Sequence, residues 1–267
     1  MKIILTIARN AFLESVRDKI LYNLVFFAAL LIGFSLMLGE WSVFARDTVI
    51  KDFTLAVMSV SGLLMAIFVG IGLLQKEIQR KTVLTLLAKP LPRWYFILGK
   101  YLGLLMVLAV NLAVMTLCFL LALRFVGAKI ESRLLLAIYL IYVEMAVVVA
   151  AALLFSSFST PTLSALFTLG VYVAGHLAGD ILNHLEFVRK HGAMLPGSPA
   201  FTEVQERVVR AVYYLIPNLE NFNIRGRVVY DLPLGENYVL FTTLHGLTFI
   251  GAYLLIACLW FNKRDFI

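Results

Sequence analysis

Charged residues are scarce in this sequence: only 15% of its 267 residues are Asp, Glu, Lys or Arg, whereas 61% are hydrophobic. A soluble domain usually has about 25% charged and about 45–50% apolar residues, so an ordinary soluble protein is excluded. Cysteine is nearly absent as well. Cys118 and Cys258 both lie within long apolar segments, and they therefore indicate neither a disulfide framework nor a zinc site.

Motifs for nucleotide binding and hydrolysis are also missing. A P-loop would read G-x-x-x-x-G-K-[ST], but the only Gly-Lys pair, Gly99-Lys100, is followed by Tyr101. The G-x-S-x-G and H-E-x-x-H patterns of hydrolases do not occur either. We therefore expect a chain with no catalytic residues and no cofactor of its own. All but one of the charged residues lie outside the apolar segments described next, so the net charge of +7 does not indicate a nucleic-acid partner, and we expect none.

The sequence is rich in long apolar segments, of which there are six. Together they contain a single charged residue, Glu144. Each meets or approaches the length of about 20 residues with which a helix crosses roughly 30 Å of hydrocarbon. We therefore predict an all-α, polytopic membrane protein that forms one transmembrane domain over 1–267. The predicted spans are 20–39, 53–74, 101–123, 134–155, 162–179 and 238–261.

The distribution of basic residues predicts the orientation in the membrane, because Lys and Arg concentrate in cytoplasmic loops. If both termini lie on one side, twelve Lys and Arg residues in 1–19, in 75–100 and after span six lie there too, against five in the short loops opposite. We therefore expect a multi-pass protein of the cell membrane (plasma or bacterial inner membrane) with both termini in the cytoplasm. The segment 183–237 would then be extracytoplasmic.

Two segments beside the spans are amphipathic. In 1–19, small and apolar residues recur at helical spacing opposite charged ones, which predicts a helix in the cytoplasmic membrane interface. A plain extension of the first span is the alternative. Between spans two and three, the basic segment 75–93 has Leu86 and Leu87 on one helical face, and Pro90 and Pro92 end the helix.

Glu144 is the intramembrane polar candidate. It is the eleventh of 22 residues in the fourth predicted span, so it lies near the middle of the bilayer. A carboxylate there is costly, and such a residue is a functional candidate by default. One alternative is an ion-coupled secondary transporter that uses Glu144; the other is a protonated or hydrogen-bonded side chain that fixes helix packing.

His176, Asp180 and His184 are a weak candidate for a metal site. They follow one another at intervals of four residues near the end of the fifth predicted span, and therefore share one side of a helix. Imidazole and carboxylate groups suit zinc, copper, iron or nickel, which would make the chain a membrane metalloprotein. The alternative is that they are interfacial polar residues at a helix end.

The region 75–100 carries a series of short motifs in a fixed order. These are Glu77, Lys81-Thr82, Leu86-Leu87, Pro90 with Arg93 three residues later, and Gly99-Lys100. With Arg264-Asp265-Phe266 just past span six, this order resembles the ABC transporter type-2 permease family. Within this family, the spans of the chain most resemble those of the permeases for nitrous-oxide reductase maturation, also described as multicopper-enzyme maturation permeases.

This resemblance implies a function. Such permeases are non-catalytic membrane subunits that work as dimers, with a second copy or a homologue, beside two ATP-binding subunits on separate chains. ATP and Mg would bind to those partner subunits. The segment 75–93 would be the coupling helix that docks on an ATP-binding subunit. The docking residues carried over by this resemblance are Glu77, Thr82, Leu86, Leu87, Pro90 and Arg93.

Overall fold

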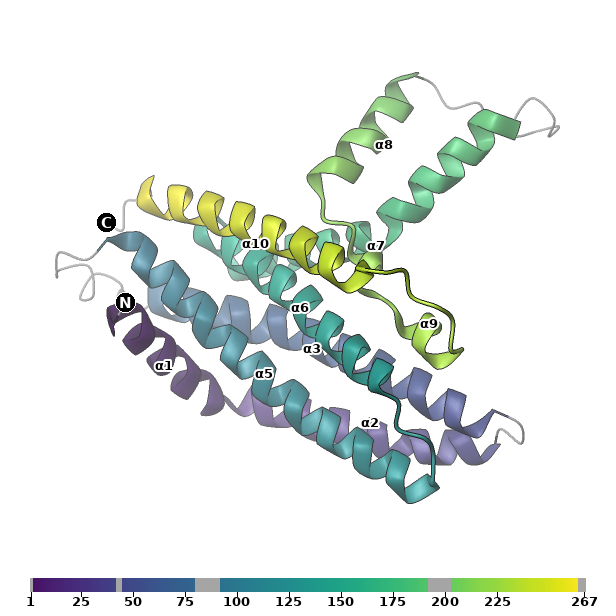
Figure 1. Cartoon of the computed structure of the whole chain (residues 1–267). Coiled ribbons are helices and arrows are strands. Elements are labelled where there is room, and N and C mark those ends of the chain that lie inside the picture. Colours follow the sequence, from purple (N-terminus) through teal and green to yellow (C-terminus); the bar gives the residue numbers. More distant parts are fainter. Residues whose placement is uncertain (1, 42–44, 80–91, 192–202, 264–267) are drawn as a thin grey trace. The chain divides into compact units, whose positions relative to one another are not determined.

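Helices make up 89% of the residues that the computed structural model describes, and none of those residues forms a strand, which confirms the predicted all-α fold. The described residues are 2–41, 45–79, 92–191 and 203–263. The helices, labelled as in Figure 1, are α1 (Lys2–Val16), α2 (Lys19–Trp41), α3 (Arg46–Gln79), α5 (Arg93–Val126), α6 (Ser132–Phe158), α7 (Pro161–His191), α8 (Glu203–Leu215), a 3₁₀ turn (Leu219–Phe222), α9 (Arg225–Val229) and α10 (Tyr238–Lys263).

Six of the described helices are long and apolar enough to cross a membrane, namely α2, α3, α5, α6, α7 and α10. This confirms the prediction of a polytopic membrane protein. The longest are α3 and α5, with 34 residues each. At 1.5 Å per residue each is about 51 Å long, well beyond the roughly 30 Å of a hydrocarbon core. Both helices therefore extend past the membrane core into polar surroundings.

Several helices continue beyond the limits that the apolar segments suggest. The second predicted span ends at residue 74, but α3 continues to Gln79. The third begins at residue 101, but α5 begins at Arg93, and the fifth ends at residue 179, but α7 continues to His191. Hydropathy marks the apolar part of a helix rather than its ends. Polar residues such as Gln75, Lys76 and Glu77 have good helix propensity and extend α3 without interruption. Residues 75–79 are therefore helix, and they are not the start of a loop.

The chain forms two compact units, 1–168 with 222–267, and 169–221. In the first unit α3 and α6 are central: 72% and 78% of their apolar cores are buried, against 17% for α2. Every residue of 143–154 in α6 is buried, and all of them except Glu144 are apolar. This stretch is covered because α6 packs against α3, α5 and α10.

The second unit contains the later part of α7, then α8 and the turn after it. Helix α8 is amphipathic and ends at Leu215, two residues before Pro217. Gly175 in α7 allows the chain after α8 to approach closely. A Cβ atom on Gly175 would lie 2.7 Å from the carbonyl oxygen of Pro217 and 2.7 Å from Cγ of Leu219.

Candidate functional site

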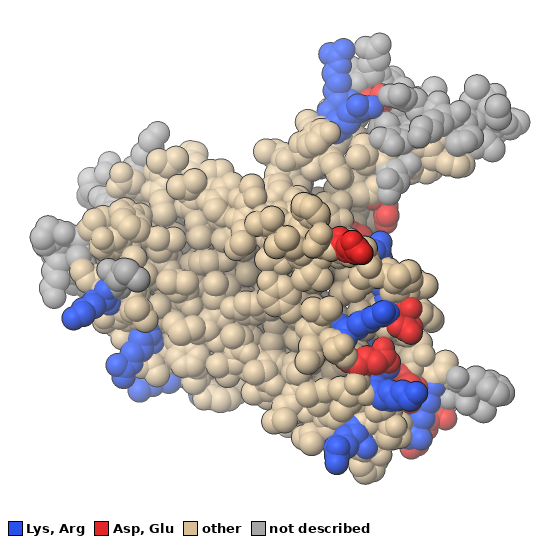
Figure 2. Space-filling view, in the orientation of Figure 1, with Lys and Arg blue, Asp and Glu red and all other residues tan. Residues whose placement is uncertain are grey.

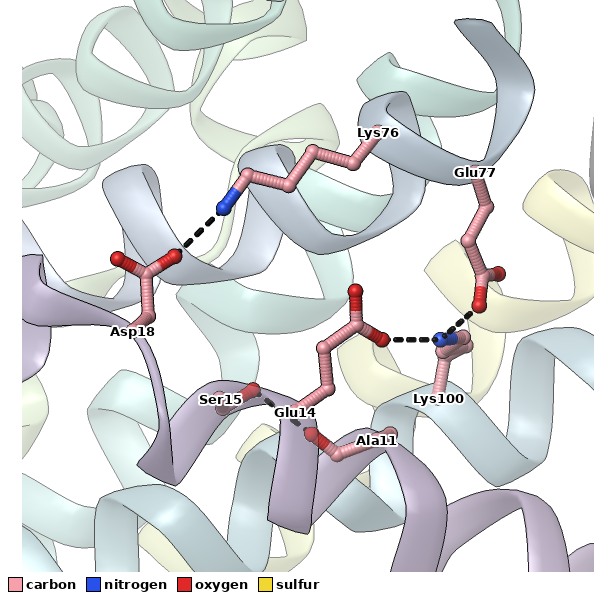
Figure 3. Close-up of polar contacts among 7 residues, drawn as sticks. All are labelled: Ala11, Glu14, Ser15, Asp18, Lys76, Glu77 and Lys100. Atoms are coloured by element: carbon pink, nitrogen blue, oxygen red, sulfur yellow. Dashed lines mark hydrogen bonds and ion pairs between the residues drawn. The ribbon is translucent and has the colours of Figure 1, made fainter. Parts of the chain in front are cut away.

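Three consecutive side chains at the end of α3 contact three different parts of the first unit. They are Gln75, Lys76 and Glu77, just before the segment 80–91. Successive residues of a helix point about 100° apart, so three in a row spread around the axis and reach separate neighbours. We call these residues and the charged partners described below, Glu14, Asp18 and Lys100, the α3-end cluster. Figure 3 shows all of them except Gln75.

Lys100 and Glu77 form the buried part of the α3-end cluster. Lys100 is only 2% exposed, and its Nζ lies 2.7 Å from Oε1 of Glu77. Oε2 of Glu14 is 3.6 Å from the same nitrogen, and the ring of Phe96 is 5.7 Å away. An ammonium group removed from water requires such partners, because an isolated buried charge is strongly unfavourable. This pair therefore fixes the position of α3 against α5.

Lys76 connects α3 to the turn between α1 and α2. Its Nζ donates to Oδ2 of Asp18 at 2.6 Å, and Oδ1 of Asp18 accepts the backbone N–H of Ile20 at the start of α2. The hydrogen bond from Lys76 holds the pKa of the Asp18 carboxyl below its ordinary value, against the opposing effect of partial burial. Asp18 therefore stays ionised, caps α2 and joins it to α3.

Gln75 connects α3 to the turn between α6 and α7. Its Nε2 donates to the backbone oxygen of Ser156 at 3.1 Å and to that of Ser159 at 2.8 Å. The last carbonyl groups of a helix have no hydrogen-bond donor within the helix, so the buried amide of Gln75 supplies the donor that they lack. Through this amide the end of α3 also holds the end of α6.

Helix α1 packs on α5 through small residues. A Cβ atom on Gly99 would lie 2.6 Å from Cγ2 of Ile7. One on Gly103 would lie 2.6 Å from Cβ of Ala11 and 2.7 Å from the backbone oxygen of Ala8. The two backbones can therefore approach closely only because both α5 positions are glycine. This contact keeps Glu14 near Lys100.

The structure describes only part of the predicted docking segment. Glu77 lies in the α3-end cluster. Arg93 begins α5, and its side chain is outside the described set. The remaining predicted docking residues lie outside the described residues, and they are Thr82, Leu86, Leu87 and Pro90.

Glu144 lies in the most buried part of α6 and is 2% exposed. Its neighbours in sequence face different helices. A Cβ atom on Gly62 of α3 would lie 2.8 Å from Cγ of Met145, and one on Gly246 of α10 would lie 3.0 Å from Cγ1 of Val143. Glu144 therefore belongs to the packed interior of the first unit.

The three residues of the weak metal candidate do not gather into a site. Nδ1 of His176 lies 3.1 Å from the backbone oxygen of Tyr172, and the rings of these two residues are in contact. Asp180 and His184 are exposed. Among the described residues no group of three or more His, Cys, Asp or Glu side chains could hold a metal ion.

A second set of ion pairs lies at the opposite end of the first unit. The charged residues of this unit gather at its two ends, and the surface between the ends is mostly uncharged (Figure 2). These pairs join the start of α3, the turn between α5 and α6, and the region around α9. They are Lys51 with Glu131 at 3.0 Å, Asp52 with Arg225 at 2.8 Å, and Arg133 with Asp231.

Sequence reasoning assigned Glu77 to docking on the ATP-binding subunit and identified the Gly99-Lys100 pair only as a motif. It missed that Lys100 is the buried partner of Glu77, and it missed Gln75 altogether. One sequence signal could have predicted this pair: an acid, Glu77, follows one apolar segment, and a lysine, Lys100, begins the next. In consecutive antiparallel spans these two positions lie at the same end, where they can form an ion pair.

The comparisons with known proteins agree with this architecture. The family model described as "ABC-2 family transporter protein" matches residues 5–265, which is nearly the whole chain. A search of curated proteins found no match. With six helices able to span a membrane and a family match over this length, the chain belongs to the ABC-2 transporter family of membrane permeases.

Proposed function

We propose that this chain is the permease subunit of an ABC transporter, in which ATP hydrolysed on separate subunits moves a substrate across the membrane. Membership of the ABC-2 family and the absence of a P-loop in the sequence support this proposal. The observation that carries it is the α3-end cluster. The segment 80–91 joins the end of α3 to the start of α5, so a force on it would act on the end of α3, and that end is bonded to three other parts of the first unit.

The orientation that fits this function places both termini and the segment 80–91 in the cytoplasm. The excess of twelve Lys and Arg residues over five in the opposite short loops supports it. The start of α1, the start of α5 and the end of α10 lie at one end of the first unit (Figure 1). The rings of Phe96 in α5 and Phe261 in α10 stack there at 5.4 Å. An ATP-binding subunit in the cytoplasm would meet this end.

We propose that the segment 75–93 binds the ATP-binding subunit through its part beyond the α3-end cluster, since Gln75 and Glu77 are bonded inward to the first unit. Leu86 and Leu87 would enter an apolar pocket of the partner, and Arg93 would supply a charged contact. Movement of this segment would displace α3 as a rigid body. Lys76, Glu77 and Gln75 would pass that displacement to α2, α5 and α6. ATP and Mg would stay on the partner.

A complete transporter would contain two permease subunits, either two copies of this chain or this chain and a homologue. The membrane helices of one subunit would then face those of the other around a common pathway. The maturation-permease subgroup, for nitrous-oxide reductase or multicopper enzymes, remains our proposal for its closest functional class.

Co-purification with a candidate ATP-binding subunit from the same genome tests the docking proposal. The double variant Leu86→Asp, Leu87→Asp should insert normally but lose the ATP-binding subunit, because truncating or charging a buried interfacial anchor costs about 2 kcal/mol or more. Leu232→Asp is the matched control, since Leu232 is 51% exposed near α9, at the opposite end. Retention of the partner at wild-type stoichiometry by the double variant would show that the docking assignment is wrong.

A further inference from the structure

A groove between α2 and α5 opens beside the turn that joins α1 to α2. It has a volume of about 500 Å³, within the range of about 300–1,000 Å³ of ligand-binding clefts. Its wall begins at Val16, the last residue of α1, and continues along Tyr22 and Phe26 of α2 and Val110 of α5. Nearly all of this lining is apolar, so the groove suits a hydrocarbon chain.

One polar side chain, Asn111, lies in the wall of the groove. It is 2% exposed, and neither its amide nitrogen nor its amide oxygen has a hydrogen-bond partner in the structure. A buried amide without partners is unfavourable, and more so in a membrane, where no water can replace them. A ligand that carries a carbonyl or hydroxyl group into the groove would supply the missing bond.

Two basic residues lie beside the turn at which the groove opens. Arg17 and Lys19 flank the α1–α2 turn, next to the lining residue Val16, and both side chains are exposed. Neither forms an ion pair with a described residue. The nearest acids are already engaged: Asp18 pairs with Lys76, and Glu14 pairs with Lys100. Two cations without an ion-pair partner among the described residues therefore lie next to one end of an apolar groove.

We propose that this groove binds an anionic phospholipid of the adjoining leaflet, with its phosphate at Arg17 and Lys19, one acyl chain in the groove, and its ester groups within reach of Asn111. A basic residue near a membrane surface contributes roughly a fivefold preference for an anionic lipid, so two contribute about twenty-five-fold. A neighbouring groove between α2 and α3 provides the contrast. Its lining is apolar like that of the first, with a volume of about 260 Å³, but the lysine nearest to it in sequence, Lys51, is already paired with Glu131.

Native mass spectrometry of the delipidated full-length protein tests this proposal, with phosphatidylglycerol and phosphatidylcholine of identical acyl chains as probes. The wild type should retain phosphatidylglycerol about twenty-five-fold better. Arg17→Gln with Lys19→Gln should reduce that retention to the level of phosphatidylcholine. Val110→Trp should abolish retention of both lipids by filling the groove. Val110 is half exposed, so the protein should still fold.

Two controls match these variants. Val60→Trp fills the neighbouring groove at a residue of similar exposure, and Arg124→Gln with Lys129→Gln removes two exposed cations near the other end of α5. Both should bind lipid as the wild type does. The proposal is overturned if the wild type retains both lipids equally, if Val110→Trp still binds, or if the two cation pairs have equal effects. It is also overturned if Arg17→Gln with Lys19→Gln releases an ATP-binding subunit but leaves lipid retention unchanged.

Discussion

At the scale of single residues, the buried charges of the first unit explain how its helix ends are held. Lys100 is 2% exposed, although it lies in the first part of an apolar helix, where an apolar side chain such as leucine is the usual choice. The acid 2.7 Å away and the second acid 3.6 Å away make the lysine tolerable. A buried pair adds little net stability, but the loss of one partner is severe because the other charge remains buried.

Lys100→Leu should therefore destabilise the protein by about 3–5 kcal/mol, because Glu77 would remain buried without its cation. Glu77→Leu alone should have a similar effect. The double variant should recover most of the loss, since no buried charge remains. Thermal unfolding of the four proteins in one detergent measures the coupling. A double variant as unstable as the sum of the two single changes would show that the pair is not coupled.

Glu144→Gln should preserve both assembly and transport, because an amide has nearly the shape of a carboxyl group and can both donate and accept hydrogen bonds. This expectation treats Glu144 as a packing residue within α6. Size-exclusion profiles and transport by the reconstituted complex would measure the two properties. If transport fell while assembly stayed normal, Glu144 would have a functional role, as the ion-coupled alternative requires.

At the scale of the elements, the sequence predicted the helices well and their contacts poorly. The six membrane-spanning helices can be recognised in the sequence because a run of about 20 apolar residues rarely forms anything other than a membrane-spanning helix. The end of α3 was placed at residue 74 because hydropathy falls there, although helix propensity does not. The hydrogen bond from Gln75 to Ser156 joins residues 81 positions apart, and no short sequence pattern predicts such a long-range contact.

Gly103→Val should separate α1 from α5. The new Cβ atom would lie 2.7 Å from the backbone oxygen of Ala8, and a backbone atom cannot move aside as a flexible side chain can. Overpacking of this kind typically costs about 1–3 kcal/mol. Limited proteolysis of α1 and thermal unfolding would both report the change. Gly33→Val in α2 is the control, because nothing lies within 4 Å of its Cβ position. Equal effects of the two variants would show that close packing of α1 on α5 at Gly103 does not stabilise the protein.

At the scale of the whole molecule, the account requires both termini and the segment 80–91 on the cytoplasmic side. Single cysteines at Lys89 and Ser198, in a background with Cys118→Ala and Cys258→Ala, should label oppositely with an impermeant thiol reagent in intact cells. Ser198→Cys should react from outside, and Lys89→Cys should react only after the membrane is opened. Labelling of Lys89→Cys from outside would reverse the orientation and remove the proposed docking surface.

The central claim is that the end of α3 transmits movement from an ATP-binding partner to the rest of the first unit. Gln75→Met tests it most directly, because this change removes the bonds to the end of α6 but keeps the size of the side chain. Thr116→Val is the control, since it removes only a bond within α5. The measurement is the distance between spin labels at Lys129 and Leu232 in the complex, with and without ATP and vanadate. We predict an ATP-dependent change in the wild type and in Thr116→Val, and little change in Gln75→Met with the partner still bound. A full wild-type change in Gln75→Met would contradict the account.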